Sequence, residues 1–535
     1  MVLYRNIIPF LGRSIFGRLL SSSVTTDPFS NCHTNVSNET VNALTEVQTV
    51  AWVRSIRKHK TRTFLDVNDG SSPRNLQVVC PSDAMPEHVA VGSAVSVRGR
   101  LVLRPLRRRH QQQEDEEERK PGEDETPEFT SELVADVIRN LSGQPSAEIG
   151  STTDADHSLL GAMSASRPKL GLLRSDRGLA WRHRVPEMAA LLRLRAACKS
   201  IVHRVMQERA YLEVDTPILT RTDCEGAGET FLIQSTKPTL SATPDGSGEL
   251  HSEENTDVHL TVSAQLHLEA LALGMGRVYS LSPTFRAEPS HSRFHLAEFL
   301  MLEAESVLLD SSAALCTEME TIVASIVSSF LEKLDSRASD LPKDLHLVLS
   351  YLSESLNSSI AEHTAKLRRM LLQPFAKVTF TEATNYLQKA GRFRSSDGGL
   401  SKEEEQKICH WVGDRPVFVT DFPASMKPFY CASSSTAKES PACVQAVDLL
   451  VPDIGELIGG SVRETDHSTL AAKMLRQGLN PQSPSMAWYL GLRGHGGAPH
   501  AGFGLGFDRL LLWILGVYNI RDTVPFPREL EKIYM

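Results

Sequence analysis

The run Gly502-Phe503-Gly504-Leu505-Gly506-Phe507-Asp508-Arg509, followed by the apolar stretch 510–517, governs the interpretation of this 535-residue chain. Glycines at alternate positions leave one face of a strand without side chains, so a flat ligand can approach the backbone closely. A buried helix then begins beside a fixed arginine. A bare strand face followed by a cation indicates a nucleotide site, and a Gly-rich bend leading into a core helix is the alternative.

A second cationic motif lies upstream of this run. Phe285-Arg286-Ala287-Glu288 ends a strand-like segment, and His295-Leu296-Ala297-Glu298-Phe299 follows after a polar loop. An arginine is permanently charged and forks onto phosphate oxygens, although a surface Arg/Glu ion pair is the simpler alternative. Further upstream, five apolar residues at helical spacing predict a helix: Leu191, Leu194, Cys198, Ile201 and Val205. This helix leads into a segment that ends at Pro217.

These three segments resemble motifs 1, 2 and 3 of the class II aminoacyl-tRNA synthetases, in the order that this family uses. Four further segments, 224–229, 260–266, 455–464 and 519–528, narrow the match. Over roughly residues 45–530 the chain resembles the asparaginyl-tRNA synthetases of subclass IIb.

The resemblance implies an α+β fold with two domains. Residues 185–535 are expected to form the class II synthetase catalytic domain, a six- or seven-stranded antiparallel sheet with flanking helices. An N-terminal OB-fold β-barrel at 40–142 precedes it, joined by a linker at 143–184. The length allows more than one domain, and 41% hydrophobic and 23% charged residues are ordinary for a globular protein.

The barrel is also indicated by the residues themselves. Short apolar or β-branched runs separated by turn residues predict strands at 47–56, 63–68, 76–80, 94–102 and 132–141. A low-complexity segment at 106–131 is predicted to be a disordered insertion. In subclass IIb this domain binds the anticodon, which implies that Phe64 stacks on a base and Gln77 reads a base edge. A core position is the alternative for Phe64.

The implied reaction has two steps: asparagine attacks the α-phosphate of ATP to give an asparaginyl-adenylate, and the terminal ribose of tRNA(Asn) then takes the acyl group. Such a reaction needs fixed cations rather than a protein nucleophile. The resemblance assigns catalysis to Arg286 and Arg509, and Mg²⁺ to the carboxylates of Asp448 and Glu456, for which two solvated side chains are the alternative. The implied ATP-binding residues are Arg286, Glu288, His295, Phe299, Glu456 and Arg509.

Amino-acid binding is assigned by the same resemblance to Glu225, Gln265 and Arg463. Aspartyl enzymes place a lysine three residues after that glutamine, whereas this chain has Leu268. Without that cation, the side-chain carboxylate of an aspartate substrate would lack a matching positive charge, which favours asparagine as the substrate. Glu269 either accepts from the substrate amide or has a structural role. An aspartyl-tRNA synthetase and a non-catalytic paralogue that binds RNA remain the alternatives.

Some positions depart from the family pattern. Pro289 and Phe294 stand where motif 2 usually has asparagine and arginine, and Asp508 replaces the commoner glutamate. Arg293, beside the lost arginine, is a candidate substitute for its contacts.

The N-terminus has the composition of an organellar transit peptide. Residues 1–26 carry Arg5, Arg13 and Arg18 among apolar residues and serines, with no acidic residue before Asp27. We therefore expect a mitochondrial transit peptide at 1–25 and a location in the mitochondrial matrix. The arginines interrupt each apolar run too early for a membrane span, and no membrane partner is expected.

Charge and cysteine content limit the remaining possibilities. A net charge of −8 argues against a protein that coats nucleic acid non-specifically, so tRNA binding has to come from local patches. Eight scattered cysteines with no CxxC pair disfavour a zinc site and a disulfide framework. Motif 1 forms a dimer interface in the family, so a homodimer is expected, with asparagine, ATP and tRNA(Asn) as the other partners.

Overall fold

The structure is a computed structural model, and it describes residues 45–105, 129–142, 168–221, 230–234, 258–288, 292–336, 338–353, 359–391, 399–434, 442–495, 497–530 and 532–533. The chain divides into two compact units. Unit 1 comprises Met1–Arg193 and Arg337–Asp344, and unit 2 comprises Leu194–Ser336 and Leu345–Met535. The predicted transit peptide lies outside the described residues.

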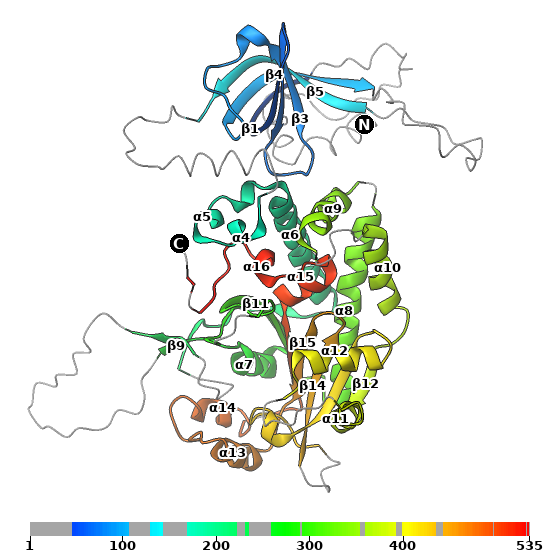
Figure 1. The fold of residues 1–535 in the computed structure, drawn as a ribbon. Coiled ribbons are helices and arrows are strands. Elements are labelled where there is room, and N and C mark those ends of the chain that lie inside the picture. Colours follow the sequence, from blue (N-terminus) through cyan, green and yellow to red (C-terminus); the bar gives the residue numbers. More distant parts are fainter. Residues whose placement is uncertain are drawn as a thin grey trace, which may run out of the picture. The chain divides into compact units, whose positions relative to one another are not determined.

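Unit 1 contains a closed five-stranded barrel, coloured blue to cyan in Figure 1. Its strands are β1 (Thr45–Lys58), β2 (Arg62–Asn68), β3 (Leu76–Pro81), β4 (Ala94–Pro105) and β5 (Phe129–Asn140). They pair in the order β1-β2-β3-β5-β4, with β3 and β5 parallel. The inward positions form an apolar core that includes Leu65, Val78, Val95, Val97 and Leu133. The predicted OB-fold architecture is confirmed.

One predicted boundary needs correction, and the predicted linker contains short helices. The insertion predicted at 106–131 ends too late, because β5 already begins at Phe129 and pairs with β4. The linker predicted at 143–184 includes two short helices, α4 (Leu170–Leu173) and α5 (Asp176–Leu179), and the 3-10 turn η3 (Arg182–Arg184). Residues 106–128 and 143–167 lie outside the described residues.

Helix α6 (Pro186–Glu208) confirms the predicted helical pattern. Proline suits the first turn of a helix because the missing N–H has no partner there. The five apolar residues named for this helix are each at most 1% exposed. The helix thus buries one continuous stripe.

An eight-stranded sheet forms the centre of unit 2 (Figure 1). In sheet order its strands are β12 (Ala376–Thr379), β13 (Val417–Pro423), β14 (Cys443–Val451), β15 (Gly455–Val462), β16 (Ala501–Gly506), β11 (Glu298–Ser306), β10 (Arg277–Phe285) and β6 (Leu212–Glu213). The prediction of six or seven antiparallel strands is wrong in number, because β12 and β6 add to the two edges as parallel partners of β13 and β10. The inner six strands are antiparallel, as predicted.

The helices of unit 2 cover this sheet. Helix α8 packs on the face of β14–β16 that carries Gly460, and Leu315 of α8 lies against that glycine. The described helices after α6 are α7 (Gln265–Met275), α8 (Ser312–Asp335), α9 (Leu341–Leu352), α10 (Ile360–Met370), α11 (Phe380–Lys389), α12 (Lys402–Trp411), α13 (His467–Arg476), α14 (Ala487–Gly491), α15 (Phe507–Leu515) and α16 (Ile520–Thr523). By length and composition α8 could cross a membrane, but 56% of its most apolar window is buried, as in a core helix.

A small three-stranded sheet lies apart from the central one. It consists of β7 (Leu219–Thr220), β9 (Val258–Leu260) and β8 (Leu232–Ile233), in that order. Its strands leave several apolar side chains exposed to solvent.

Candidate active site

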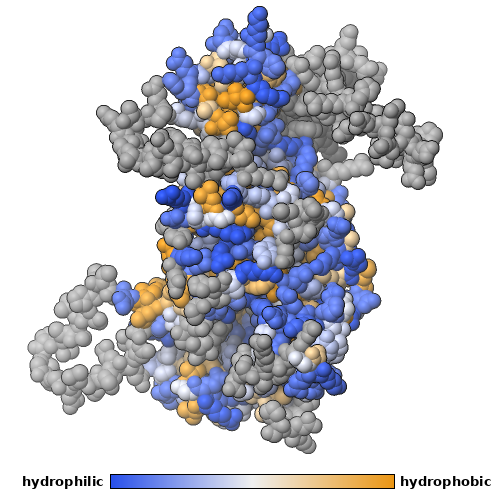
Figure 2. Space-filling view, in the orientation of Figure 1, coloured by the Kyte–Doolittle hydropathy of each residue, from blue (hydrophilic) through white to orange (hydrophobic). Residues whose placement is uncertain are grey.

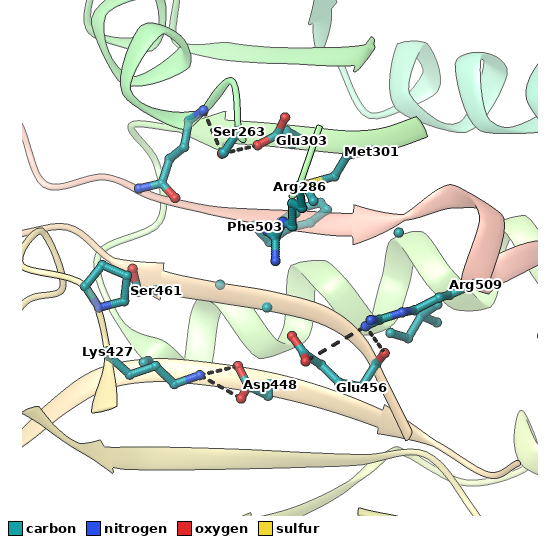
Figure 3. A pocket seen from close by; sticks show the side chains of 18 of the residues that line it. Ser263, Arg286, Met301, Glu303, Lys427, Asp448, Glu456, Ser461, Phe503 and Arg509 are labelled. Atoms are coloured by element: carbon teal, nitrogen blue, oxygen red, sulfur yellow. Dashed lines mark hydrogen bonds and ion pairs between the residues drawn. The ribbon is translucent and has the colours of Figure 1, made fainter. Parts of the chain in front are cut away.

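A cavity of about 930 Å³ opens over one face of the central sheet in unit 2. Its lining combines charged side chains from strands β11, β14 and β15, from the segment just after β10 and from the start of α15, and Figure 3 shows several of them from close by. Nine of the predicted site residues line it: Gln265, Arg286, Glu288, His295, Phe299, Asp448, Glu456, Arg463 and Arg509. The predicted Glu225 lies outside the described residues. Phe64 and Gln77 lie on the barrel of unit 1.

The strand register brings glycines of neighbouring strands together in the cavity floor. Gly504 of β16 pairs with Gly459 of β15 on one side and with Glu303 of β11 on the other. Gly504 and Gly506 line the cavity, and the stem of Arg509 packs against Gly506. A Cβ built at Gly506 would meet the stem of Arg509, at 3.6 Å, so the predicted bare face is present there, whereas a Cβ at Gly504 would lie 2.9 Å from Sδ of Met301, another lining residue.

At Gly502 the prediction of a bare face for a ligand is wrong. A Cβ built there would lie 1.8 Å from Oε2 of Glu305, so a side chain of the protein occupies the space that the glycine leaves. Gly502 is paired with Glu305 across β16 and β11. This glycine allows a carboxylate, not a ligand, to approach the strand.

The carboxylate of Glu305 holds Arg463. Nε of Arg463 donates to Oε1 of Glu305 at 3.1 Å, and Nη2 donates to Oε2 at 2.9 Å. Nη1 donates to Oγ of Ser461 at 2.6 Å, and the side chain of Arg463 is 2% exposed. Contacts among the described residues thus take three of the five N–H donors of Arg463, which leaves two for a ligand in the cavity.

Behind Arg463 lies a second buried carboxylate, Glu269 of α7. It is fully buried, and Oε2 accepts from Nη2 of Arg493 at 2.7 Å and from the hydroxyl of Tyr489 at 2.7 Å. Burial favours the neutral acid, but Arg493, His500 and Arg463 outweigh it and hold the pKa of Glu269 well below its usual range. Glu269 is absent from the lining of the cavity described above, so its geometry favours the structural role.

Gln265 connects this network to the cavity. Its Nε2 donates to Oε1 of Glu269 at 3.2 Å, while the residue lines the cavity. Leu268, one helical turn further along α7, also lines the cavity and is 1% exposed. The position that carries a lysine in the aspartyl enzymes is therefore apolar and inward-facing here.

Two further arginines, Arg286 and Arg509, point into the cavity, as Figure 3 shows. Arg286, just after β10, has its guanidinium carbon 5.9 Å from the ring centre of Phe299 and Nη1 3.7 Å from Oε1 of Glu288. Arg509 donates from Nη1 to the backbone oxygen of Glu456 at 3.0 Å. Two fixed cations thus face a cavity that also contains an aromatic ring, a combination that suits a nucleotide.

His295 lies beside these arginines and is hydrogen-bonded to Ser292. Burial, and secondly the nearby charge of Arg509, lower the pKa of His295 to about 4. The ring is therefore neutral at physiological pH and can both donate and accept a hydrogen bond.

Asp448 and Glu456 lie close together, as predicted. A Cβ built at Gly459 would lie 3.2 Å from Oε1 of Glu456 and 3.6 Å from Oδ1 of Asp448. Burial, and the repulsion by Glu456, raise the pKa of Asp448 to about 6 against the attraction of Lys427. Two carboxylates that repel each other fit a cation such as Mg²⁺, which prefers oxygen ligands and keeps sites for water and phosphate. Among the described residues, no group of three or more His, Cys, Asp or Glu side chains is arranged to hold a metal ion.

The turn before β15 fixes Glu456. Gly455 has φ +83°, and a Cβ there would lie 2.0 Å from Oε2 of Glu405, a buried residue of α12. That oxygen accepts from the backbone N–H of Glu456 at 2.8 Å and from Lys402 at 2.7 Å. Only glycine fits this position, because it combines a left-handed backbone with direct contact to a carboxylate.

Several residues of the cavity were not anticipated from the sequence: Ser263, Glu303, Glu305, Lys427 and Glu405. Glu303 accepts from the backbone N–H of Ala264 at 2.9 Å and from the hydroxyl of Ser263. A usable signal was present in β11, where Glu303 and Glu305 occupy alternate positions just after the apolar run 299–302. Lys427 and Glu405 carry no such signal.

The structure shows what two residues that depart from the family pattern, Asp508 and Phe294, contact. Asp508 is buried; its Oδ2 accepts from the backbone N–H of Leu300 at 2.9 Å, and Oδ1 is paired with Arg195 of α6. Phe294 lines the cavity, whereas the guanidinium carbon of Arg293 lies between two rings, 4.6 Å from Phe294 and 4.1 Å from Tyr518. Arg293 is not among the lining residues, so the geometry does not support it as a substitute inside the cavity. Pro289 lies outside the described residues.

Phe64 and Gln77 share the outer face of the barrel. Along β2 the inward positions are buried and the alternate ones, including Phe64, are half-buried, so the core alternative for Phe64 is wrong. Gln77 of β3 is paired with Asp66, two residues from Phe64 on the same face. With its nitrogen toward Glu132, the amide of Gln77 donates to Oε1 of Glu132 at 2.9 Å and accepts from Nη2 of Arg57 at 2.6 Å.

Comparison with known proteins gives a consistent result. Residues 173–530 match the family "tRNA synthetases class II (D, K and N)", and residues 47–116 match the family "OB-fold nucleic acid binding domain". The chain is 34% identical over 481 residues to the asparaginyl-tRNA synthetase of Mus musculus, covering 89% of this chain and 88% of that protein. It is 36% identical over 488 residues to the asparagine–tRNA ligase of Thermosynechococcus vestitus, covering 89% and 94%.

A solved structure agrees over nearly the whole length. The asparaginyl-tRNA synthetase of Pyrococcus horikoshii, crystallised with asparaginyl-adenylate, superimposes with a TM-score of 0.69 at 25% identity. The match covers 92% of this chain and 97% of that one.

Because Glu305 lies against Gly502, adding one methyl group at Gly502 is expected to lower the stability of the protein, whereas the same change at an uncrowded glycine is not. Gly502→Ala displaces the Glu305 carboxylate and is expected to cost about 1–3 kcal/mol of stability, as overpacking does. Gly491→Ala is the matched control, since a Cβ there meets nothing within 4 Å. Differential scanning fluorimetry of both variants should show a lower melting temperature for Gly502→Ala alone; equal melting temperatures would contradict the assigned contact.

Proposed function

The chain belongs to the asparaginyl-tRNA synthetases, the asparagine–tRNA ligases among the class II (D, K and N) tRNA synthetases, and from this premise we propose that it forms asparaginyl-adenylate in the cavity of unit 2 and serves translation in mitochondria. The observation that carries the site proposal is the convergence of nine predicted residues on one cavity. These residues come from segments as far apart in sequence as Gln265 and Arg509.

In the first step a carboxylate oxygen of asparagine forms a bond to the α-phosphorus of ATP, and the bond to the pyrophosphate oxygen breaks. Arg286 and Arg509 place fixed positive charge where negative charge develops on the phosphate oxygens. Phe299 offers an apolar face to the adenine ring, and neutral His295 hydrogen-bonds without adding charge. The protein supplies position and charge, and no covalent bond to the enzyme forms.

Magnesium fits this site through Asp448 and Glu456. When bound, it polarises phosphate oxygens as a Lewis acid. The turn held by Glu405 and Gly455 keeps Glu456 beside Arg509, so carboxylate and cation stay adjacent before any ligand enters.

Selection of asparagine over aspartate rests on the charges around Arg463. Glu305 already neutralises Arg463, Glu303 adds a further buried carboxylate, and Leu268 supplies no cation. A substrate carboxylate there would meet excess negative charge, whereas a neutral amide can accept from Arg463. In the second step the ribose hydroxyl of the terminal tRNA nucleotide attacks the acyl carbon and AMP leaves.

ATP–pyrophosphate exchange tests this reaction directly. We expect exchange with asparagine and none with aspartate. Arg463→Lys keeps the charge but loses the forked contact, and is expected to lower kcat/KM for asparagine about 10- to 100-fold. Arg476→Lys, at an exposed position of α13, serves as the control and should match the unsubstituted enzyme.

Three outcomes would decide against this account. Exchange with aspartate alone would establish the aspartyl alternative, and exchange with neither amino acid in folded protein would favour a non-catalytic paralogue. Full activity of Arg463→Lys would remove Arg463 from the amino-acid pocket.

Anticodon binding is proposed for the barrel face that carries Phe64 and Gln77. Phe64→Ala is expected to weaken tRNA(Asn) binding by about 1–3 kcal/mol, the contribution of one stacked base, and to leave pyrophosphate exchange unchanged. Trp52→Ala is the control, because Trp52 is an aromatic residue of β1 that is 36% exposed. Equal tRNA affinity of the two variants, measured by filter binding, would argue against stacking on Phe64.

A homodimer is proposed from an exposed apolar patch on the small sheet of unit 2. Ile218, Leu219, Leu232 and Ile233 are 38–59% exposed, and Figure 2 shows orange surface in the region of β9. Patches of this kind mark association sites, and this one adjoins Pro217 of the motif 1 segment. Leu219→Asp is expected to shift the species seen by analytical ultracentrifugation from twice 59.0 kDa to 59.0 kDa. A monomeric unsubstituted protein at micromolar concentration would refute the dimer.

Mitochondrial import is proposed from residues 1–25, and the matrix is the proposed location. A fusion of residues 1–40 to a fluorescent protein is expected to enter mitochondria. Replacing Arg5, Arg13 and Arg18 by glutamate should abolish that import, because transit peptides depend on their positive charge. A cytosolic location of the unsubstituted fusion would contradict the proposal.

A further inference from the structure

Lys427 is paired with Asp448, one of the two carboxylates that would hold Mg²⁺. Its Nζ lies 2.7 Å from both carboxylate oxygens of Asp448 (Figure 3). The ammonium group also lies 3.9 Å from the ring centre of Phe422. Its side chain is 19% exposed and that of Asp448 is 16% exposed, so the pair is largely shielded from water.

The backbone around Lys427 holds this arrangement. Lys427 follows the 3-10 turn η4 (Ala424–Met426) and precedes Pro428. Its backbone oxygen accepts from Nε2 of Gln477 at 3.0 Å. The lysine is therefore placed by the fold and is not a surface side chain that happens to lie near a carboxylate.

The charges near Gly459 explain what Lys427 does. Asp448 and Glu456 supply two negative charges, and Lys427 neutralises one of them. A dication that approaches without a nucleotide meets a site of reduced negative charge whose Asp448 oxygens already have a partner. A dication that arrives with ATP brings phosphate oxygens, which supply further metal ligands and an alternative partner for the ammonium group.

We propose that Lys427 is the resident counter-ion of the metal-binding carboxylates, which excludes free Mg²⁺ until ATP brings the metal with its phosphates. Lys427 is a positioning residue in this scheme, because it acts through Asp448. The inference rests on the proposed function only in its use of ATP. Because of this lysine, the nucleotide and the metal are expected to enter the site together.

The test measures binding of Mn²⁺ alone, followed by electron paramagnetic resonance, to the full chain without nucleotide or amino acid. The unsubstituted protein is expected to bind Mn²⁺ weakly. Lys427→Met removes one positive charge beside the two carboxylates and is expected to tighten Mn²⁺ binding at least about 100-fold, because a dication and a neighbouring unit charge repel strongly at an effective dielectric constant near 20. Lys427→Arg retains the charge and should bind as weakly as the unsubstituted protein.

Lys473→Met is the matched control. Lys473 forms an equally shielded pair with Glu464 at 2.7 Å, yet it is not part of the cavity lining, so Mn²⁺ affinity should not change. Unaltered Mn²⁺ affinity in folded Lys427→Met would overturn the proposal. So would tight Mn²⁺ binding by the unsubstituted protein, a result that needs no variant to fold. Neither measurement involves turnover, so loss of the proposed asparagine activity would leave both readable.

Discussion

The buried pair between Arg463 and Glu305 is the interaction on which the candidate site depends. Both side chains are at most 2% exposed, and such charges are costly in a protein interior unless each is paired and hydrogen-bonded. Here the charges are paired: Glu305 accepts from two nitrogens of Arg463, Ser461 accepts from the third, and the ring of Tyr430 lies 5.2 Å from the guanidinium carbon. The pair presents a cation at the cavity wall whose charge is already balanced, and a balanced cation suits a neutral amide better than a carboxylate.

Strand register makes this pair possible. Gly502 lies opposite Glu305 and has no side chain, so the carboxylate can lie against the strand. Gly504 in the same way leaves space for the sulfur of Met301. Glu269 and Arg493 then support Arg463 from behind, in a network that also includes Tyr489 and His500. The glycine run thus serves two purposes: Gly502 admits a buried ion pair, and Gly506 leaves open strand face beside Arg509.

The sequence allowed prediction of the parts of the site that carry a local pattern. Arg286, Glu288 and Arg509 lie in recognisable motifs, and the barrel was visible because turn residues separate its strands. Lys427 and Glu405 could not be predicted, because each is a single charged residue outside any periodic pattern. Glu305 stood in an alternating pattern, but its partner Arg463 lies 158 residues away, so the pairing itself was not visible. The two extra sheet strands were missed for a related reason. Strand β6 has two residues and β12 has four, too few to show a period.

The charge around Arg463 is expected to decide the choice of substrate: the cavity of unit 2 should prefer a neutral amide because Glu305 already neutralises Arg463. Isothermal titration calorimetry with non-hydrolysable sulfamoyl analogues of asparaginyl-adenylate and aspartyl-adenylate measures that preference without turnover. The account predicts that the asparaginyl analogue binds at least about 100-fold more tightly, the difference expected when a carboxylate is buried without a matching cation. Equal affinities, or tighter binding of the aspartyl analogue, would contradict it.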